Sequence, residues 1–161
     1  MNAALFDPRE ILLALARHAV SYVVVGGIAV QAHGGQRLTQ DLDIAVPSDR
    51  ENYTRLAAAL VDIDARILGP EGRRSTGPPS APLLASGDLW QLDSDHGLVD
   101  VIVLPAALGT FALWRERAHE VDLGDVAVPV AARADLIAMK RSSGRPQDLE
   151  DVDLLEGLPD N

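Results

Sequence analysis

The sequence contains no cysteine, which excludes both a disulfide framework and a thiolate metal site. Aromatic residues are also scarce, at 4% of the chain against 47% for all hydrophobic residues, so a core must be built mainly from Val, Leu, Ile and Ala. The longest apolar runs are about half the ~20 residues that a membrane-spanning helix needs, and no signal peptide is recognisable. We therefore expect a cytoplasmic protein with no membrane partner.

Basic residues are fewer than acidic ones, and the formal net charge of the 161-residue chain is −10. This acidity repels nucleic acid at long range. Two small basic clusters remain that could hold phosphate groups locally: Arg73 with Arg74, and Lys140 with Arg141 and Arg145. The charge therefore disfavours a general nucleic-acid binder without excluding RNA as a partner.

The chain length suits one domain, which we place at residues 1–161. Hydrophobic periodicity, capping signals and turn residues predict helices and strands in mixed order. Helices are expected at 8–19, 28–33, 48–61 with Ser48 as its N-cap, 111–118, and in a tail at 131–156; strands are expected at 22–25, 41–46, 89–93 and 98–104, with a hairpin at 120–130. This order predicts an α+β fold with a mixed, mostly antiparallel sheet flanked by helices.

Residues 69–87 are rich in Gly, Pro and Ser and predict a flexible loop. A connection of this length is uncommon unless it is mobile or functional. One hypothesis is a lid that carries Arg73 and Arg74 to the substrate. The alternative is an ordinary surface loop.

The most informative stretch joins two glycines to a pair of carboxylates. Gly26 and Gly27 follow the strand at 22–25, where glycine permits a sharp turn and a close approach to a ligand. The helix that starts there has free N–H groups for phosphate oxygens. Asp41 and Asp43 then stand at i and i+2 of a strand, so their side chains point the same way. Two such oxygen ligands suit a Mg²⁺ ion that also holds a triphosphate.

This pattern resembles the nucleotidyltransferase superfamily related to DNA polymerase beta, whose signature has the glycine pair, a spacer and the Asp, apolar, Asp motif. With His33, Gly34, Arg37 and Thr39 it looks like the bacterial branch that holds abortive-infection toxins and antibiotic nucleotidyltransferases. The resemblance implies a nucleotidyltransferase-like fold, Mg²⁺ or Mn²⁺ as cofactor, and a nucleoside triphosphate such as ATP as substrate. It also implies an acceptor that is RNA, protein or a small hydroxylated molecule, and an antitoxin or a second copy of the chain as a partner.

A third carboxylate is expected on a neighbouring strand. Asp100 fits best because it lies in the otherwise apolar run 98–104, where a charge is costly unless it is paired or metal-bound. Asp122 is the alternative, in what reads as a polar hairpin edge. The third acid would complete a second metal site or accept the proton of the attacking hydroxyl.

Further residues are assigned around this centre. Arg37 could pair with the triphosphate, and Thr39 could hydrogen-bond a phosphate or Asp41. Resemblance to the same branch implies that Lys140 and Asp148 face the nucleotide, with Lys140 neutralising the leaving pyrophosphate and Asp148 orienting Lys140 or the acceptor. The alternative is a helix pair that covers the sheet, with Lys140 in solvent.

Two other Asp, apolar, Asp pairs occur, Asp62 with Asp64 and Asp151 with Asp153. The first pair lies at a predicted helix end without a glycine turn, and the second lies inside a predicted helix, where i and i+2 diverge. Both are expected to be solvated surface. The four histidines show no metal-ligand spacing, and a packing role is favoured for His33.

The sequence therefore predicts a metal-dependent nucleotidyltransferase. Its catalytic residues would be Asp41, Asp43, Asp100 and Lys140, with the nucleotide held by Gly26, Gly27, Arg37, Thr39 and Asp148. Acidity favours a cationic small-molecule acceptor, whereas the resemblance favours a toxin of a toxin–antitoxin pair. The alternative from another class is a non-catalytic nucleotide- or partner-binding module that keeps the fold.

Overall fold

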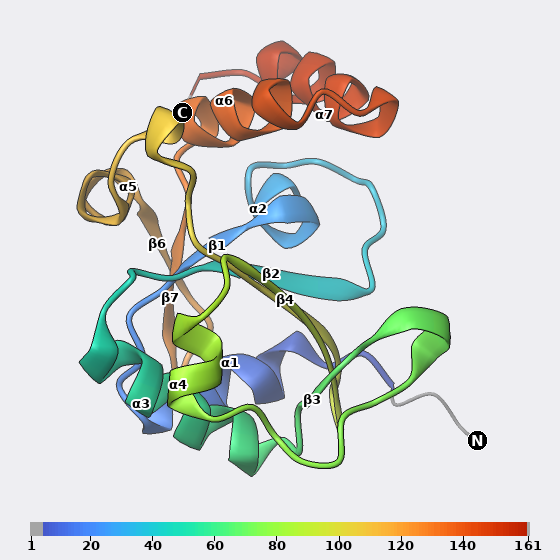
Figure 1. Cartoon of the computed structure of the whole chain (residues 1–161). Helices are drawn as coiled ribbons and strands as arrows, with labels where there is room; N and C mark the ends of the chain where they lie inside the picture. Colours follow the sequence, from blue (N-terminus) through green and yellow to red (C-terminus); the bar gives the residue numbers. More distant parts are fainter. Residues whose placement is uncertain (1–4, 161) are drawn as a thin grey trace.

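Residues 5–160 are described by a computed structural model, and within them helices lie on both faces of one seven-stranded sheet (Figure 1). The helices are α1 (Pro8–Arg17), α2 (Gly26–Ala32), α3 (Arg50–Asp62), α4 (Ala81–Ala85), α5 (Phe111–Arg117), α6 (Arg133–Ser143) and α7 (Pro146–Gly157). The strands are β1 (Val23–Val25), β2 (Asp41–Ala45), β3 (Arg66–Ile67), β4 (Leu89–Ser94), β5 (Gly97–Ile102), β6 (His119–Asp122) and β7 (Ala127–Val130).

The strand order is β3-β4-β5-β2-β1-β7-β6. The β1–β7 and β2–β5 pairs are parallel, and the other pairs are antiparallel. The prediction of an α+β fold with a mixed, mostly antiparallel sheet is therefore confirmed. The parallel β2–β5 pair matters most for the site because it joins two segments that are far apart in the sequence.

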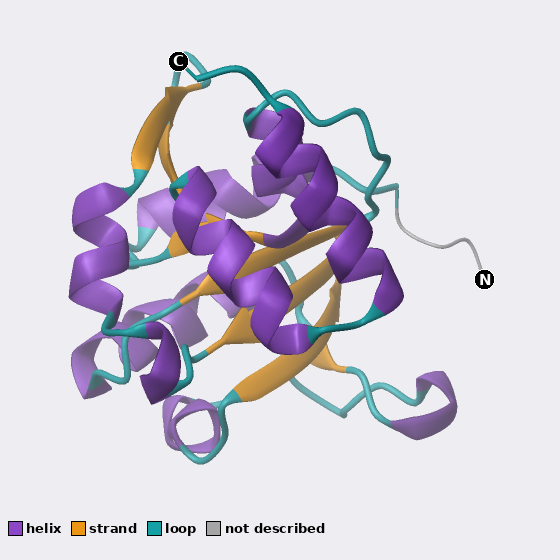
Figure 2. Ribbon diagram, turned by 90° about the horizontal axis from the view of Figure 1, so that it is seen from above, coloured by secondary structure: helices purple, strands orange, loops and turns teal. Residues whose placement is uncertain are grey.

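The helices divide into two layers (Figures 1 and 2). On one face α2 packs on β1 and β2, and the α6–α7 pair packs over α2. On the other face α1, α3 and α4 lie together. The first face is left partly open over β4 and β5, where Leu89, Gln91 and Leu98 are exposed. Within residues 5–160, no helix combines the length and the apolar character that crossing a bilayer would require.

Capping fixes where the longer helices begin. Asp7 accepts a hydrogen bond from the backbone N–H of Glu10, and Pro8 opens α1. The prediction of Ser48 as the cap of the next long helix is wrong. Asp49 is the N-cap of α3, and its Oδ2 accepts from the backbone N–H of Asn52 at 3.0 Å. The N-cap lies one residue later than predicted, so the carboxylate of Asp49 and not the hydroxyl of Ser48 caps the helix.

Aliphatic side chains form the core, as the composition predicts. The three valines of β1 are fully buried, and so are Leu42 and Ile44 of β2. Burying each such side chain is worth roughly 1.5–3 kcal/mol. Trp114 of α5 is the one tryptophan that is fully buried within the described residues, and its indole N–H donates to the carbonyl of Leu108 at 2.9 Å. The core thus holds β1 and β2 rigidly under the candidate site.

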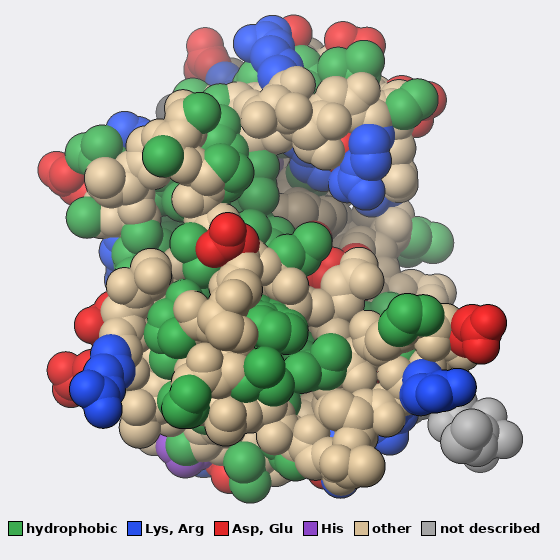
Figure 3. Space-filling model, viewed as in Figure 1, with side chains coloured by type: hydrophobic (Ala, Val, Ile, Leu, Met, Phe, Trp, Pro, Cys, Tyr) green, Lys and Arg blue, Asp and Glu red, His purple; other side chains and the backbone are tan. Residues whose placement is uncertain are grey.

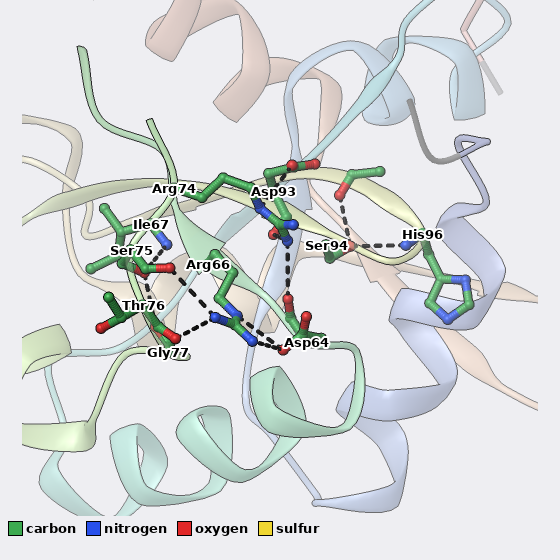
Figure 4. A network of polar contacts seen from close by, with 11 residues as sticks. Asp64, Arg66, Ile67, Arg74, Ser75, Thr76, Gly77, Asp93, Ser94 and His96 are labelled. Atoms are coloured by element: carbon green, nitrogen blue, oxygen red, sulfur yellow. Dashed lines mark hydrogen bonds and ion pairs between the residues drawn. The ribbon is translucent and has the colours of Figure 1, made fainter. Parts of the chain in front are cut away.

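The glycine- and proline-rich segment at 69–87 is attached to the sheet edge and contains α4 (Figure 4). Arg74 pairs with Asp93 of β4 through Nε at 3.1 Å. Arg66 of β3 pairs with Asp64 at 2.6 Å, and Ser75 Oγ accepts from the backbone N–H of Ile67 at 2.9 Å. Arg74 thus serves a structural ion pair at the sheet edge, which gives no support to the lid hypothesis.

Candidate active site

Three carboxylates meet on adjacent strands of the sheet. Asp41 and Asp43 lie on β2, and Asp43 is paired in register with Asp100 of the parallel strand β5. Partners in register point to the same face, and Leu42 points to the opposite face, where it is fully buried. One carboxylate oxygen from each aspartate lies within 4.8 Å of those of the other two. The structure therefore brings the predicted trio together.

The two glycines make room for this cluster. Gly26 is the first residue of α2 and has a φ of +68°, which favours glycine. A Cβ at Gly26 would lie 1.8 Å from Asp43 Oδ2, and a Cβ at Gly27 would lie 2.9 Å from Thr39 Oγ1. Neither position can carry a side chain while Asp43 and Thr39 stay in place. The glycine pair is thus required by the carboxylates as well as by the turn.

Replacing Gly26 with alanine should displace the Asp43 carboxylate. We expect Gly26→Ala to destabilise the fold by about 1–3 kcal/mol, from the left-handed backbone and the clash together. Loss of divalent-metal binding should accompany this. Chemical denaturation and Mn²⁺ titration measure the two effects. Gly157→Ala is the control, since a Cβ there meets no atom within 4 Å; equal behaviour of the two variants would contradict this reading of Gly26.

The acidic cluster is electrostatically strained. Burial raises the pKa of Asp43 to about 8, with further contributions from the charges of Asp41 and Asp100. Burial also raises the pKa of Asp100, and the nearby charge of Asp41 adds to this. Thr39 donates to Asp41 Oδ1 at 2.7 Å, which is one of the two hydrogen bonds that the sequence suggests for it. Three carboxylates this close need a proton or a cation to offset their repulsion.

A pH dependence of stability follows for the metal-free chain. The pKa of Asp43 in the folded chain lies above its ordinary value of 3.8. The contribution of Asp43 to the free energy of unfolding is therefore fully present at low pH and is lost as pH rises toward about 8. In the presence of a chelator, Asp43→Asn should remove this loss of stability. The melting temperature of the variant should therefore exceed that of the wild type by about 2–4 °C or more at pH 8, and by less at pH 5. Thermal melts across this range measure the difference. A constant difference between pH 5 and pH 8 would contradict the prediction.

Opposite the carboxylates lies a group of cationic side chains held by α7. Lys140 of α6 pairs with Asp151 at 2.8 Å and with Asp148 at 3.6 Å. Arg145 pairs with Asp148 at 2.8 Å, and Arg37 pairs with Asp151 at 2.5 Å. We call Arg37, Lys140 and Arg145, with the two aspartates that hold them, the cation cluster.

The cation cluster and the three carboxylates act on each other electrostatically. The charge of Lys140 lowers the pKa of Asp43, against the larger effect of burial. The charge of Asp43 in turn raises the pKa of Arg145, after the larger effect of its bond with Asp148. Figure 3 shows the surface hollowed beneath the α6–α7 layer, with Lys and Arg side chains above and carboxylate atoms below. The site is thus a cleft with a cationic roof and an acidic floor.

The structure separates the remaining candidates. Asp122, the alternative third acid, lies exposed on the edge strand β6, where it accepts from the N–H of Gly124. His33 bonds the carbonyl of Ala131 at 2.8 Å and borders a cavity of about 480 Å³ whose lining includes His119 and Arg133 but none of the three clustered aspartates.

The interpretation of Asp151 as solvated surface is wrong. Only 2% of Asp151 is exposed, whereas Asp153 is exposed as expected. From the sequence, Arg145 was considered only as part of a basic cluster that could hold phosphate, and Asp151 was not assigned to the site. The available signal was the i, i+3 spacing of Asp148 and Asp151, which places both on one face of a helix.

Comparison with known proteins identifies the family and the fold. Residues 4–156 match the sequence profile of the family described as "Nucleotidyltransferase of unknown function (DUF6036)". The lincosamide antibiotic adenylyltransferase LnuA, bound to lincomycin, has a TM-score of 0.62 at 15% identity, over 96% of this chain and 99% of its own. No curated protein sequence matches the chain significantly.

Two further solved structures share the fold. ANT(2")-Ia in complex with adenylyl-2"-tobramycin has a TM-score of 0.57 at 16% identity, over 92% of this chain and 84% of its own. A candidate nucleotidyltransferase from Thermotoga maritima has a TM-score of 0.55 at 15% identity, over 93% and 94%. The family match covers nearly the whole chain, so this protein belongs to the nucleotidyltransferase family DUF6036.

Proposed function

We propose that this chain is a metal-dependent nucleotidyltransferase that moves a nucleoside monophosphate from a nucleoside triphosphate to a small hydroxylated acceptor. The observation that carries the proposal is the meeting of Asp41, Asp43 and Asp100 within 4.8 Å, beneath the cation cluster. A non-catalytic binding module needs no third carboxylate beside the other two. The geometry therefore favours an enzyme.

The donor set fits a divalent cation. All three groups are carboxylates, the hard oxygen ligands that Mg²⁺ and Mn²⁺ prefer. Asp43 is central, because it neighbours Asp41 on its own strand and Asp100 on the next. When bound, the cation would supply charge neutralisation for the triphosphate and lower the pKa of an acceptor hydroxyl. Asp41, Asp43 and Asp100 would hold it.

The chain's own groups would position the substrate and move the proton. The Gly26–Gly27 turn lies against Asp43 and carries no side chain, so a triphosphate can approach its backbone. Lys140 and Arg37 would neutralise the phosphates and the departing pyrophosphate. Asp100 would accept the proton of the acceptor hydroxyl, since its carboxylate lies beside those of Asp41 and Asp43. Thr39 would keep Asp41 oriented.

The open half of the sheet is the proposed acceptor surface. Leu98 and Asp100 lie on the same face of β5, and Gln91 of β4 is the partner of Asp100 in register. Leu89, Gln91 and Leu98 are exposed beside the site. An acceptor with an apolar body and a hydroxyl could rest here with the hydroxyl at Asp100. The acidity of the chain favours a cationic acceptor, and LnuA and ANT(2")-Ia bind lincomycin and an adenylylated tobramycin.

The test is transfer of label from each α-labelled nucleoside triphosphate with Mg²⁺ or Mn²⁺. Aminoglycosides and lincosamides are offered in one arm, and total RNA and a protein extract in the others. Label on a small molecule supports the proposal. Label on RNA or protein alone would keep the enzyme class but overturn the acceptor. No transfer in any arm, with all four nucleotides, would favour the binding module.

A further inference from the structure

The buried carboxylate of Asp151 joins two cations from distant parts of the chain. Its Oδ2 atom lies 2.5 Å from Nη1 of Arg37 and 2.8 Å from Nζ of Lys140. Arg37 precedes it by 114 residues, in the connection between α2 and β2, and Lys140 lies on α6. One oxygen thus fixes the loop beside the acidic centre to the helical tail above it.

The Asp151 carboxylate is buried and charged, which is costly unless other groups compensate for the lost solvation. Only 3% of the Asp151 side chain is exposed, against 34% for Arg37 and 12% for Lys140. Hydrogen bonds from Lys140 and Arg37 outweigh the effect of burial and lower the pKa of Asp151, so the group stays charged. A buried ion pair of this kind is a weak source of stability. It does restrict where its partners can lie.

The cation cluster keeps capacity for a further anion. Three cations share two carboxylates, Asp148 and Asp151, which leaves one net positive charge in the cluster. A guanidinium has five N–H donors and an ammonium has three, and Asp151 takes one from each. The other donors are available to a further anion, and 34% of the Arg37 side chain and 12% of the Lys140 side chain stay exposed.

We propose that Asp151 is a positioning residue for the triphosphate, which holds Arg37 and Lys140 together so that both cations meet the phosphates. This deepens the proposed function and rests on it for the identity of the ligand. Asp151 itself touches no phosphate. It acts through the two cations, which would otherwise repel each other and separate, Arg37 with its loop and Lys140 with its helix.

Binding of inorganic tripolyphosphate with Mn²⁺ tests the proposal without requiring transfer. Calorimetry should show that Asp151→Asn weakens tripolyphosphate binding by about 10-fold or more, since each cation makes a charge-assisted bond to phosphate. Binding of Mn²⁺ alone should stay within about two-fold of the wild type, because Asp151 is not a ligand. Asp151→Glu, which keeps the charge, should recover most of the loss. Asp153→Asn, exposed on the same helix, is the matched control.

The contrary outcomes are distinct. Tighter tripolyphosphate binding by Asp151→Asn would show that Asp151 competes with phosphate for the cations, and unchanged binding would show that it only supports the fold; either overturns the proposal. If Asp151→Asn does not fold, Arg37→Gln takes its place in the experiment. Normal tripolyphosphate binding by Arg37→Gln would likewise overturn the proposal. If the wild type does not bind Mn²⁺, the metal site and hence the proposed function are refuted instead.

Discussion

Replacing Asp43 with asparagine should abolish transfer by this chain while leaving its fold intact. Asp43 neighbours both other carboxylates, so its loss removes the central oxygen ligand. Charge stabilisation by a bound cation is worth several kcal/mol in the transition state, so we expect a loss of at least about 10³-fold in rate. Asparagine has nearly the same shape as aspartate and should keep its packing against Gly26.

A thermal-shift experiment reads the same substitution without an acceptor. Mn²⁺ with a nucleoside triphosphate should raise the melting temperature of the wild type, because both bind only the folded chain. The shift should vanish in Asp43→Asn. Asp122→Asn, which removes a carboxylate on the exposed edge strand β6, should keep the full shift. An undiminished shift in Asp43→Asn would refute the assignment of the metal site.

The parts of the site that are local in sequence were predictable. Asp41 and Asp43 share a face because strand side chains alternate, and the glycines before them belong to the same motif. The strands β4 and β5 were also predicted, at residues 89–93 and 98–104. For these features the chain geometry within about twenty residues is decided by propensity and periodicity.

The non-local parts required the structure. The choice between Asp100 and Asp122 depends on which strand pairs with β2, and the parallel pairing with β5 brings in Asp100. The burial of Asp151 depends on Arg37, which lies 114 residues away. Periodicity places Asp151 on a helix face but does not say what that face meets. Tertiary contacts decide such pairings, and no local pattern encodes them.

The contacts of residues 73–77 are a second case in which the sequence does not reveal non-local contacts. Their composition predicts a chain without order, yet Ser75 and Arg74 bond to groups on β3 and β4. Each of these contacts joins a loop side chain to a group on a strand, so composition alone could not show it. Contacts between distant segments thus fix local geometry at the sheet edge as they do at the acidic centre.

Asp100→Asn should separate binding from chemistry. Asp41 and Asp43 remain to hold a metal with its triphosphate, so tripolyphosphate binding should change little, whereas transfer should fall by about 10²–10⁴-fold because the proposed base is lost. Single-turnover label transfer under saturating nucleotide measures the chemical step, and calorimetry measures binding. Asp122→Asn is the control, since Asp122 is exposed on the edge strand β6 and does not belong to the cluster. An equal loss of binding and transfer would make Asp100 a metal ligand needed for the nucleotide, and full transfer would show that two carboxylates suffice.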